Sequence, residues 1–159
     1  MEPLLTFERI ASDLVGMKVS QLWRGHGSAI FLEFGALSPS RVVRRDGSPG
    51  NPRGQFTIGI EWSWRIEDAT SVVCGSWSEE DLWEPAFDLV RNSSVKALSI
   101  VGRLPEIDLA LTDGRHLLSF MTAEGDPEWF IIDRRSESEI SLSVRDGLLF
   151  KNDETAPLY

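Results

Sequence analysis

Residues 106–121 read EIDLALTDGRHLLSFM, and this stretch decides the predicted fold. Apolar and polar residues alternate on both sides of an Asp113-Gly114 pair, which is the repeat of strands with one buried face. An Asp-Gly pair favours the positive φ angles of a two-residue type I′ turn. We therefore predict a β-hairpin with strands at 106–112 and 115–121.

A two-residue turn also fixes which residues face each other across the hairpin. The predicted pairs are Thr112 with Arg115, Leu111 with His116, Leu109 with Leu118, and Ile107 with Phe120. This register places Leu118 and Phe120 on the buried face, and a slip of one residue would turn both to solvent. His116 is then expected on the inward face as a hydrogen-bonded histidine at the rim of the core. A lone hairpin is unstable in water, so other strands must flank it.

Further elements are predicted from the spacing of apolar residues elsewhere. Helices are predicted at 7–15 and 79–91, and strands at 18–24, 28–34, 55–67, 70–77, 95–101, 128–133, 140–144 and 148–150. The 55–67 run has a large apolar residue at every even position from 56 to 66, which indicates a central strand or a long bent one crossing the core. Ser78 with Asp81 resembles a capping box, and Pro85 predicts a kink, or a short first turn with a restart at Pro85.

The order of these elements repeats along the chain. One helix and three strands at 7–66 are followed by another helix and three strands at 79–121. We predict a single α+β domain over 1–159, mainly antiparallel sheet with two short helices, built from two helix-plus-meander halves as an internal duplication would produce. The tail at 152–159 is predicted to fray.

Composition excludes several classes of protein. The net charge is −9, and residues 55–92 alone carry eight acidic and two basic groups. Such a surface repels phosphate backbones, so nucleic-acid binding is not expected. No apolar run has the length of a membrane span, the N-terminus does not read as a signal peptide, and the single Cys74 excludes an internal disulfide. These features predict a cytoplasmic protein.

The sequence shows no recognisable catalytic, cofactor or metal motif. His26 and His116 have no companion at metal-ligand spacing, and Cys74 is expected to be a buried inert thiol. Most of the six tryptophans fit the core, whereas Trp77 and Trp129 are candidate interface anchors. We predict no cofactor and favour a protein without enzymatic activity.

Residues 35–54, GALSPSRVVRRDGSPGNPRG, are too rich in proline and glycine to form a core element. Long loops inside compact domains are either functional or disordered. Four arginines, Arg41, Arg44, Arg45 and Arg53, make this loop the basic island of the chain. It is therefore either a solvated connector or the roof of a pocket for an anionic ligand.

Several features between residues 61 and 132 go together. They are Trp64-Arg65, Cys74-Gly75-Ser76, an acidic helix, Gly102 before a pair of strands, the run DLAL at 108–111, the Asp113-Gly114 turn, Leu118 with Phe120, and Trp129 after an acidic turn. In these the chain resembles a diffuse group of small uncharacterised bacterial proteins, some of which lie beside polymorphic toxins and behave like their immunity proteins. The resemblance implies a shared architecture and brings no catalytic residues.

These observations lead to three functional expectations. The first is a non-enzymatic protein-binding module whose acidic face meets a basic protein, as an immunity protein meets a toxin. That face comprises Glu79, Glu80, Asp81, Glu84 and Asp88. The alternatives are a binding protein or enzyme for a small anion under the 35–54 loop, and a structural homodimer joined through apolar sheet faces.

Overall fold

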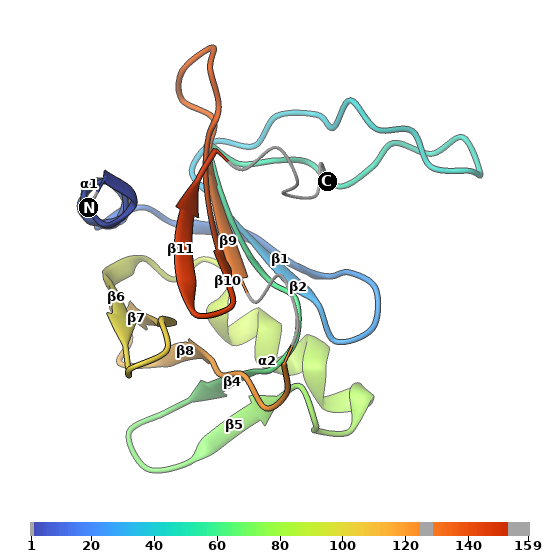
Figure 1. The fold of residues 1–159 in the computed structure, drawn as a ribbon. Coiled ribbons are helices and arrows are strands. Elements are labelled where there is room, and N and C mark those ends of the chain that lie inside the picture. Colours follow the sequence, from blue (N-terminus) through green and yellow to red (C-terminus); the bar gives the residue numbers. More distant parts are fainter. Residues whose placement is uncertain (1, 125–128, 153–159) are drawn as a thin grey trace.

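The structure is a computed structural model and describes residues 2–124 and 129–152 (Figure 1). Within them lie two α-helices, one 3₁₀ turn and eleven strands, which confirms the predicted α+β class. The helices are α1 (Glu2–Leu14) and α2 (Trp83–Val90), the latter preceded by the 3₁₀ turn η1 (Glu80–Leu82). The strands are β1 (Val19–Arg24), β2 (Ile30–Phe34), β3 (Phe56–Ile60), β4 (Trp64–Glu67), β5 (Val72–Gly75), β6 (Val95–Val101), β7 (Glu106–Leu111), β8 (His116–Ser119), β9 (Trp129–Asp133), β10 (Ile140–Arg145) and β11 (Leu148–Lys151).

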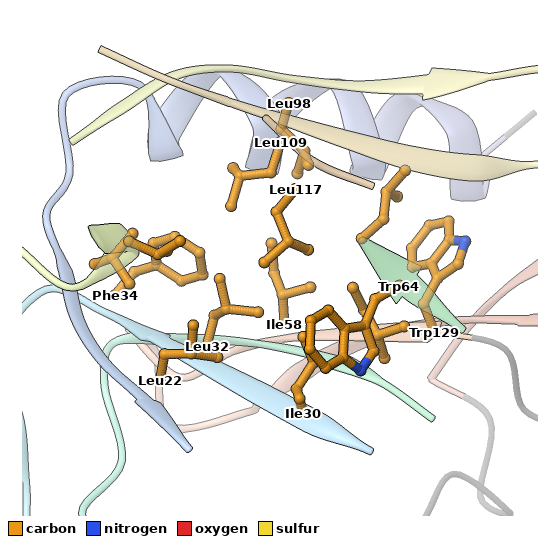
Figure 2. Close-up of a cluster of buried hydrophobic side chains, with 14 of the residues drawn as sticks. Leu22, Ile30, Leu32, Phe34, Ile58, Trp64, Leu98, Leu109, Leu117 and Trp129 are labelled. Atoms are coloured by element: carbon orange, nitrogen blue, oxygen red, sulfur yellow. The ribbon is translucent and has the colours of Figure 1, made fainter. Parts of the chain in front are cut away.

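The strands form two antiparallel sheets that share one core. The six-stranded sheet has the order β1-β2-β3-β9-β10-β11, and the five-stranded sheet has the order β5-β4-β8-β7-β6. Figure 2 shows Leu32 and Ile58 of the first sheet pointing toward Leu109 and Leu117 of the second. All four side chains are fully buried, so burial of these two facing sheets supplies the main stabilisation. Neither described helix has the length and apolar character that crossing a bilayer would need.

The two predicted meanders lie in different sheets, apart from the end of the 55–66 run, and each sheet is completed by strands from elsewhere in the chain. β1, β2 and β3 belong to the six-stranded sheet, whereas β6, β7 and β8 belong to the five-stranded sheet. The chain then crosses over, because β4 and β5 join β8 while β9 to β11 join β3. The two halves are therefore interleaved.

The two helix–strand junctions pair with each other. Four backbone hydrogen bonds connect them, namely Gly16 N–H to Val95 O, Asn92 N–H to Val19 O, Val19 N–H to Ser93 O, and Val95 N–H to Met17 O, all at 2.8–2.9 Å. The four bonds form two equivalent pairs. Adding 76 to the donor's residue number and subtracting 76 from the acceptor's converts the Gly16–Val95 bond into the Asn92–Val19 bond, and the Val19–Ser93 bond into the Val95–Met17 bond. Gly16 and Asn92 also share a left-handed backbone, with φ of 84° and 70°. An internal duplication would produce such a repetition, and the duplication itself stays a prediction.

Two buried tryptophans repeat the same arrangement. Trp64, the first residue of β4, donates its indole N–H to the Ser28 carbonyl in the β1–β2 turn at 2.7 Å. Trp129, the first residue of β9, donates to the Pro105 carbonyl in the β6–β7 turn, also at 2.7 Å. Each indole packs edge-on against an aromatic residue of a helix, Trp83 for Trp64 and Phe7 for Trp129. β4 and β9, the strands that begin with these tryptophans and are called here the crossover strands, are therefore each hydrogen-bonded to a turn of the other sheet.

The central hairpin forms, but its predicted turn and register are wrong. The observed pairs are Asp108 with Leu118, Leu109 with Leu117, and Ala110 with His116. Among the turn residues 112–114, Gly114 has the positive φ, 89°, and the Asp113 carboxylate accepts the Arg115 amide hydrogen at 2.9 Å. This hydrogen bond favours a three-residue turn, so Leu117 is buried while Leu118 is only partly covered. His116 accordingly lies on the face away from the core.

The 55–67 run is two strands rather than one. It breaks at residues 61–63, where the chain passes from β3 in one sheet to β4 in the other. Trp62, predicted to face inward, is 47% exposed at this crossing. Even-numbered residues are nevertheless buried in both strands, for example Ile58 in β3 and Ile66 in β4.

The second helix begins differently from the prediction. Ser78 does not cap it, since its hydroxyl accepts the Gly75 amide hydrogen at 2.9 Å. A short 3₁₀ turn comes first, as expected, but the helix restarts at Trp83 and Pro85 is its third residue. Amides in the first turn of a helix have no partner within it, so proline costs no hydrogen bond there.

The first helix begins earlier than predicted, at Glu2, with Thr6 buried inside it. The tail predicted to fray, 152–159, lies outside the described residues except for Asn152. That residue exchanges hydrogen bonds with Ser141 at 2.7 and 3.0 Å.

Candidate functional site

The loop at 35–54, called here the arginine loop, folds back on itself between β2 and β3 (Figure 1). Ser38 and Arg53 exchange backbone hydrogen bonds of 2.7 and 2.9 Å near its base. Farther out, Val43 bridges Pro49, and the Gly50 amide donates to the Val42 carbonyl at 2.8 Å. The two arms therefore form a ribbon above the outer face of the six-stranded sheet.

Three aromatic rings form a floor beneath this ribbon. Trp23 of β1 stacks on Phe31 of β2, with centroids 4.3 Å apart and planes 19° from parallel, and Phe130 of β9 lies 6.0 Å from Phe31. Gly59 of β3 makes room for them, because a Cβ atom there would lie 2.2 Å from the Phe130 ring. The missing side chain in β3 lets the rings of β2 and β9 approach across it.

The arginine loop and the aromatic floor enclose a pocket of about 300 Å³. Loop residues Arg44, Asn51 and Arg53 line one side of the pocket. The floor lines the other side, and Glu33, Thr57 and Arg134 also line the pocket. The pocket therefore combines an apolar floor with charged walls, as small-molecule sites commonly do.

Glu33 is a buried carboxylate in this pocket, only 1% exposed. Its Oε2 accepts hydrogen bonds from the Gly54 amide at 2.9 Å and the Thr57 hydroxyl at 2.5 Å. Burial raises the pKa of Glu33, and these two bonds together with Arg134 only partly oppose that rise. Arg134 gives limited help because its Nη1 lies 3.9 Å from the carboxylate.

Arginines outnumber carboxylates in the pocket lining, and the ion pairs of Arg134 with Glu33 and Glu139 are long, at 3.9 and 3.6 Å. Arg44 donates to neutral oxygens, those of Asn51 at 3.1 Å and Ser48 at 3.4 Å. Arg134 donates to Thr57 through Nη1, but its buried Nε makes no hydrogen bond with any described residue. Burial and the nearby charge of Arg53 lower the pKa of Arg134. The lining thus carries three arginines against one carboxylate whose ionisation is disfavoured.

The structure brings only some of the predicted basic residues together. Arg44 and Arg53 line the pocket, whereas Arg41 lies in a neighbouring hollow and the exposed Arg45 lines neither. Glu33 and Arg134 were missed from the sequence. Alternation in β1 and β2 could have placed Trp23, Phe31 and Glu33 on one face, but no local signal brings Arg134 there.

The predicted acidic face is largely neutralised within the chain. Arg24 pairs with Glu80 at 3.0 Å, and Arg91 pairs with Glu84 at 2.8 Å and with Asp88 at 2.7 Å. Exposed Glu79 and Asp81 have no ion pair among the described residues. Close to them in the chain, Trp77 is 85% exposed, whereas the other candidate interface anchor, Trp129, is fully buried.

The histidines and the cysteine do not form a site with one another. His116 Nδ1 lies 2.7 Å from the Asp108 carboxylate on the outer face of the hairpin, and His26 is exposed in the β1–β2 turn. Cys74 is buried, and burial raises the pKa of its thiol. Across residues 2–124 and 129–152, no three His, Cys, Asp or Glu side chains gather as a metal ion would require.

Comparisons with protein-family models, curated proteins and solved structures find no match to this chain.

Proposed function

We propose that this chain binds a small organic anion with a flat apolar body in the pocket under the arginine loop. The observation that carries the proposal is the aromatic floor of Trp23, Phe31 and Phe130, enclosed in one pocket with Arg44 and Arg53. A planar ring gains contact area on such a floor, and an oxyanion at its edge gains charge-assisted hydrogen bonds from guanidinium groups.

The size of the pocket limits the ligand. Its volume of about 300 Å³ lies at the lower end of the range for small-molecule sites. One or two fused rings with a short acidic substituent would fill it. A polymer or a long acyl chain would leave most of its length outside.

Calorimetric titration with three naphthalene probes of the same shape tests the proposal. The probes are 2-naphthoate, which is anionic, 2-naphthamide, which is neutral, and 2-naphthylmethylammonium, which is cationic. We expect the anion to bind at least tenfold more tightly than the amide and the cation not to bind. Equal affinities, or no binding of the anion, would contradict the proposal.

Two charge-matched variants locate the binding. Arg53→Gln should weaken 2-naphthoate binding about tenfold or more, because hydrogen bonds to charged groups contribute roughly 1.5–3 kcal/mol. Arg45→Gln removes the same charge from the same loop but lies outside the pocket, so its affinity should stay within about twofold of the wild type. Equal losses in both variants would indicate a general charge effect.

We propose, as a second candidate, that the surface around Trp77 binds a basic protein. The specific observation is a tryptophan that is 85% exposed, beside Glu79 and Asp81, which have no ion pair among the described residues. Exposed tryptophans are frequent anchors of protein interfaces, and the two carboxylates would favour a cationic partner. This is the arrangement that an immunity protein would offer to a toxin.

A pull-down from native lysate at low and high salt tests this second candidate. We expect a basic protein to be retained at low salt and released at high salt. Trp77→Ala and the Glu79→Lys/Asp81→Lys double variant should each lose it. Leu148→Ala, at a similarly exposed residue on the edge strand β11, is the matched control and should retain it.

A further inference from the structure

Glu33 has one oxygen committed to the fold and one that is not. Both of its described hydrogen bonds, from the Gly54 amide and the Thr57 hydroxyl, reach Oε2. Oε1 accepts no hydrogen bond of ordinary geometry from the described residues; only a weak contact from the Trp23 side chain reaches this carboxylate, which is almost completely buried and lines the pocket. A largely buried carboxylate oxygen without a close donor is costly, and a ligand in the pocket could supply one.

No close cation offsets this cost. The nearest is Arg134, 3.9 Å from Oε2, and it is itself shared with Glu139, whose carboxylate lies 3.6 Å from Nε. Arg44 and Arg53 line the pocket from the arginine loop, and the positions paired with Glu33 on the neighbouring strands are the uncharged Gln21 and Thr57. Among the described residues, the ion pair of Glu33 is therefore the long one with Arg134, at 3.9 Å.

A second polar group in the pocket is only weakly partnered. The indole N–H of Trp23 is buried and makes no hydrogen bond of ordinary geometry with the described residues, and a weak hydrogen bond from it to Glu33 lowers the pKa of that carboxyl. The indole N–H can only donate, so it needs an acceptor. A ligand oxygen would meet that need.

We infer that the ligand is an aromatic carboxylate, and that Glu33 binds it as the protonated partner of a carboxyl–carboxylate pair. The inference rests on the proposed function, since it concerns the same pocket. Two adjacent carboxylates in a region of low dielectric constant cannot both stay ionised, so the pair holds one proton. The proton comes from solvent and forms the O–H bond of the Glu33 carboxyl, which donates to the ligand carboxylate; no other covalent bond forms or breaks.

This arrangement links binding to pH. The ligand keeps its negative charge for the arginines, while Glu33 must be protonated. Affinity is then constant at low pH and falls as pH rises above the pKa of Glu33 in the free protein, by about tenfold per pH unit for one linked proton. The rise in that pKa caused by burial extends the range of tight binding upward.

Calorimetry with 2-naphthoate between pH 5.5 and 9, in buffers of different ionisation enthalpy, measures both the affinity and the protons taken up. The probe stays ionised throughout, because carboxyl groups titrate near pH 4. Glu33→Gln places a permanent amide donor where the protonated acid would stand. We expect this variant to bind 2-naphthoate at least tenfold more tightly than the wild type at pH 8.5, without pH dependence or proton uptake.

Two further variants serve as controls. His26→Asn removes the imidazole in the turn beside Trp23 and Phe31 and should keep the wild-type pH dependence. Thr57→Val removes a hydrogen bond that lowers the pKa of Glu33, so the pH at which affinity begins to fall should move upward. This variant also tests the inference if Glu33→Gln fails to fold.

The outcomes separate the two proposals. If 2-naphthoate binds the wild type without proton uptake, and Glu33→Gln and Thr57→Val leave the pH profile unchanged, the role of Glu33 is wrong while the binding function stands. If 2-naphthoate does not bind at any pH, both are wrong.

Discussion

Lys18 and Ser94 face each other in an antiparallel bridge, and each lies four residues beyond the end of its helix. Hydrogen bonds flank this bridge symmetrically and join the start of β1 to the start of β6. The six-stranded and five-stranded sheets are therefore connected by backbone as well as by the core, and we expect them to unfold together.

Amide hydrogen exchange measured by NMR tests this cooperativity. The amides of Gly16, Val19, Asn92 and Val95 should exchange at similar slow rates, close to the rate set by global unfolding, because their hydrogen bonds form one symmetric set. If Gly16 and Asn92 differed about a hundredfold in protection, the halves would open independently.

The two crossover tryptophans should contribute equally to stability. Trp64→Phe and Trp129→Phe each remove an indole donor and leave a carbonyl, that of Ser28 or Pro105, without its partner. We expect each to lower the free energy of unfolding by about 1–3 kcal/mol in urea titrations. Trp77→Phe, at an exposed site, should change it by less than about 0.5 kcal/mol. A large difference between the two buried variants would argue against equivalent roles.

Gly59→Ala should damage the pocket as well as the fold. The new methyl group would lie 2.2 Å from the Phe130 ring, which must move. We expect a loss of roughly 1–3 kcal/mol in stability and weaker binding of 2-naphthoate, because Phe130 is part of the floor. The double variant Gly59→Ala/Phe130→Leu should lose less stability than the two single variants added together. Simple additivity would show that the methyl group does not displace this ring.

The pH dependence of the free energy of unfolding should show the raised pKa of Glu33. Its pKa is raised in the folded protein, so folding takes up a proton between the unfolded and folded pKa values. The stability this proton confers is fully present below the unfolded pKa of about 4.3 and is lost as pH rises through the folded pKa. The stability of Glu33→Gln relative to wild type should therefore increase from pH 4.5 to pH 8 in urea titrations. A constant difference would place the Glu33 pKa at its ordinary value.

The spacing of apolar residues predicted most helices and strands, because an element with one buried face has apolar residues at regular intervals along the sequence. It could not choose between the two turns open to Asp113-Gly114, since both use a glycine with positive φ. The choice depends on the Asp113–Arg115 hydrogen bond and on burial of Leu117. The position of β9 between β3 and β10 is likewise a tertiary outcome that no local pattern encodes.

The candidate site was predicted only in part. Composition identified the arginine loop and hence Arg44 and Arg53, whose charges stand out in a proline- and glycine-rich segment. Glu33 was not predicted, because acidic residues are seldom fully buried. The arginine loop folds back over the sheet and covers it. Arg134 joins the site from about eighty residues beyond the loop through the pairing of β3 with β9.

The late position of β9 in the chain sets the order in which the sheets can be finished during translation. All five strands of the β5-β4-β8-β7-β6 sheet have been synthesised once residue 119 leaves the ribosome, whereas β3 still lacks its neighbour. The nascent chain must carry this unpaired edge until residues 129–133 emerge. A ribosome that stalls before Trp129 would thus release a product with one finished sheet and one open edge, the form most prone to aggregate and to be captured by chaperones.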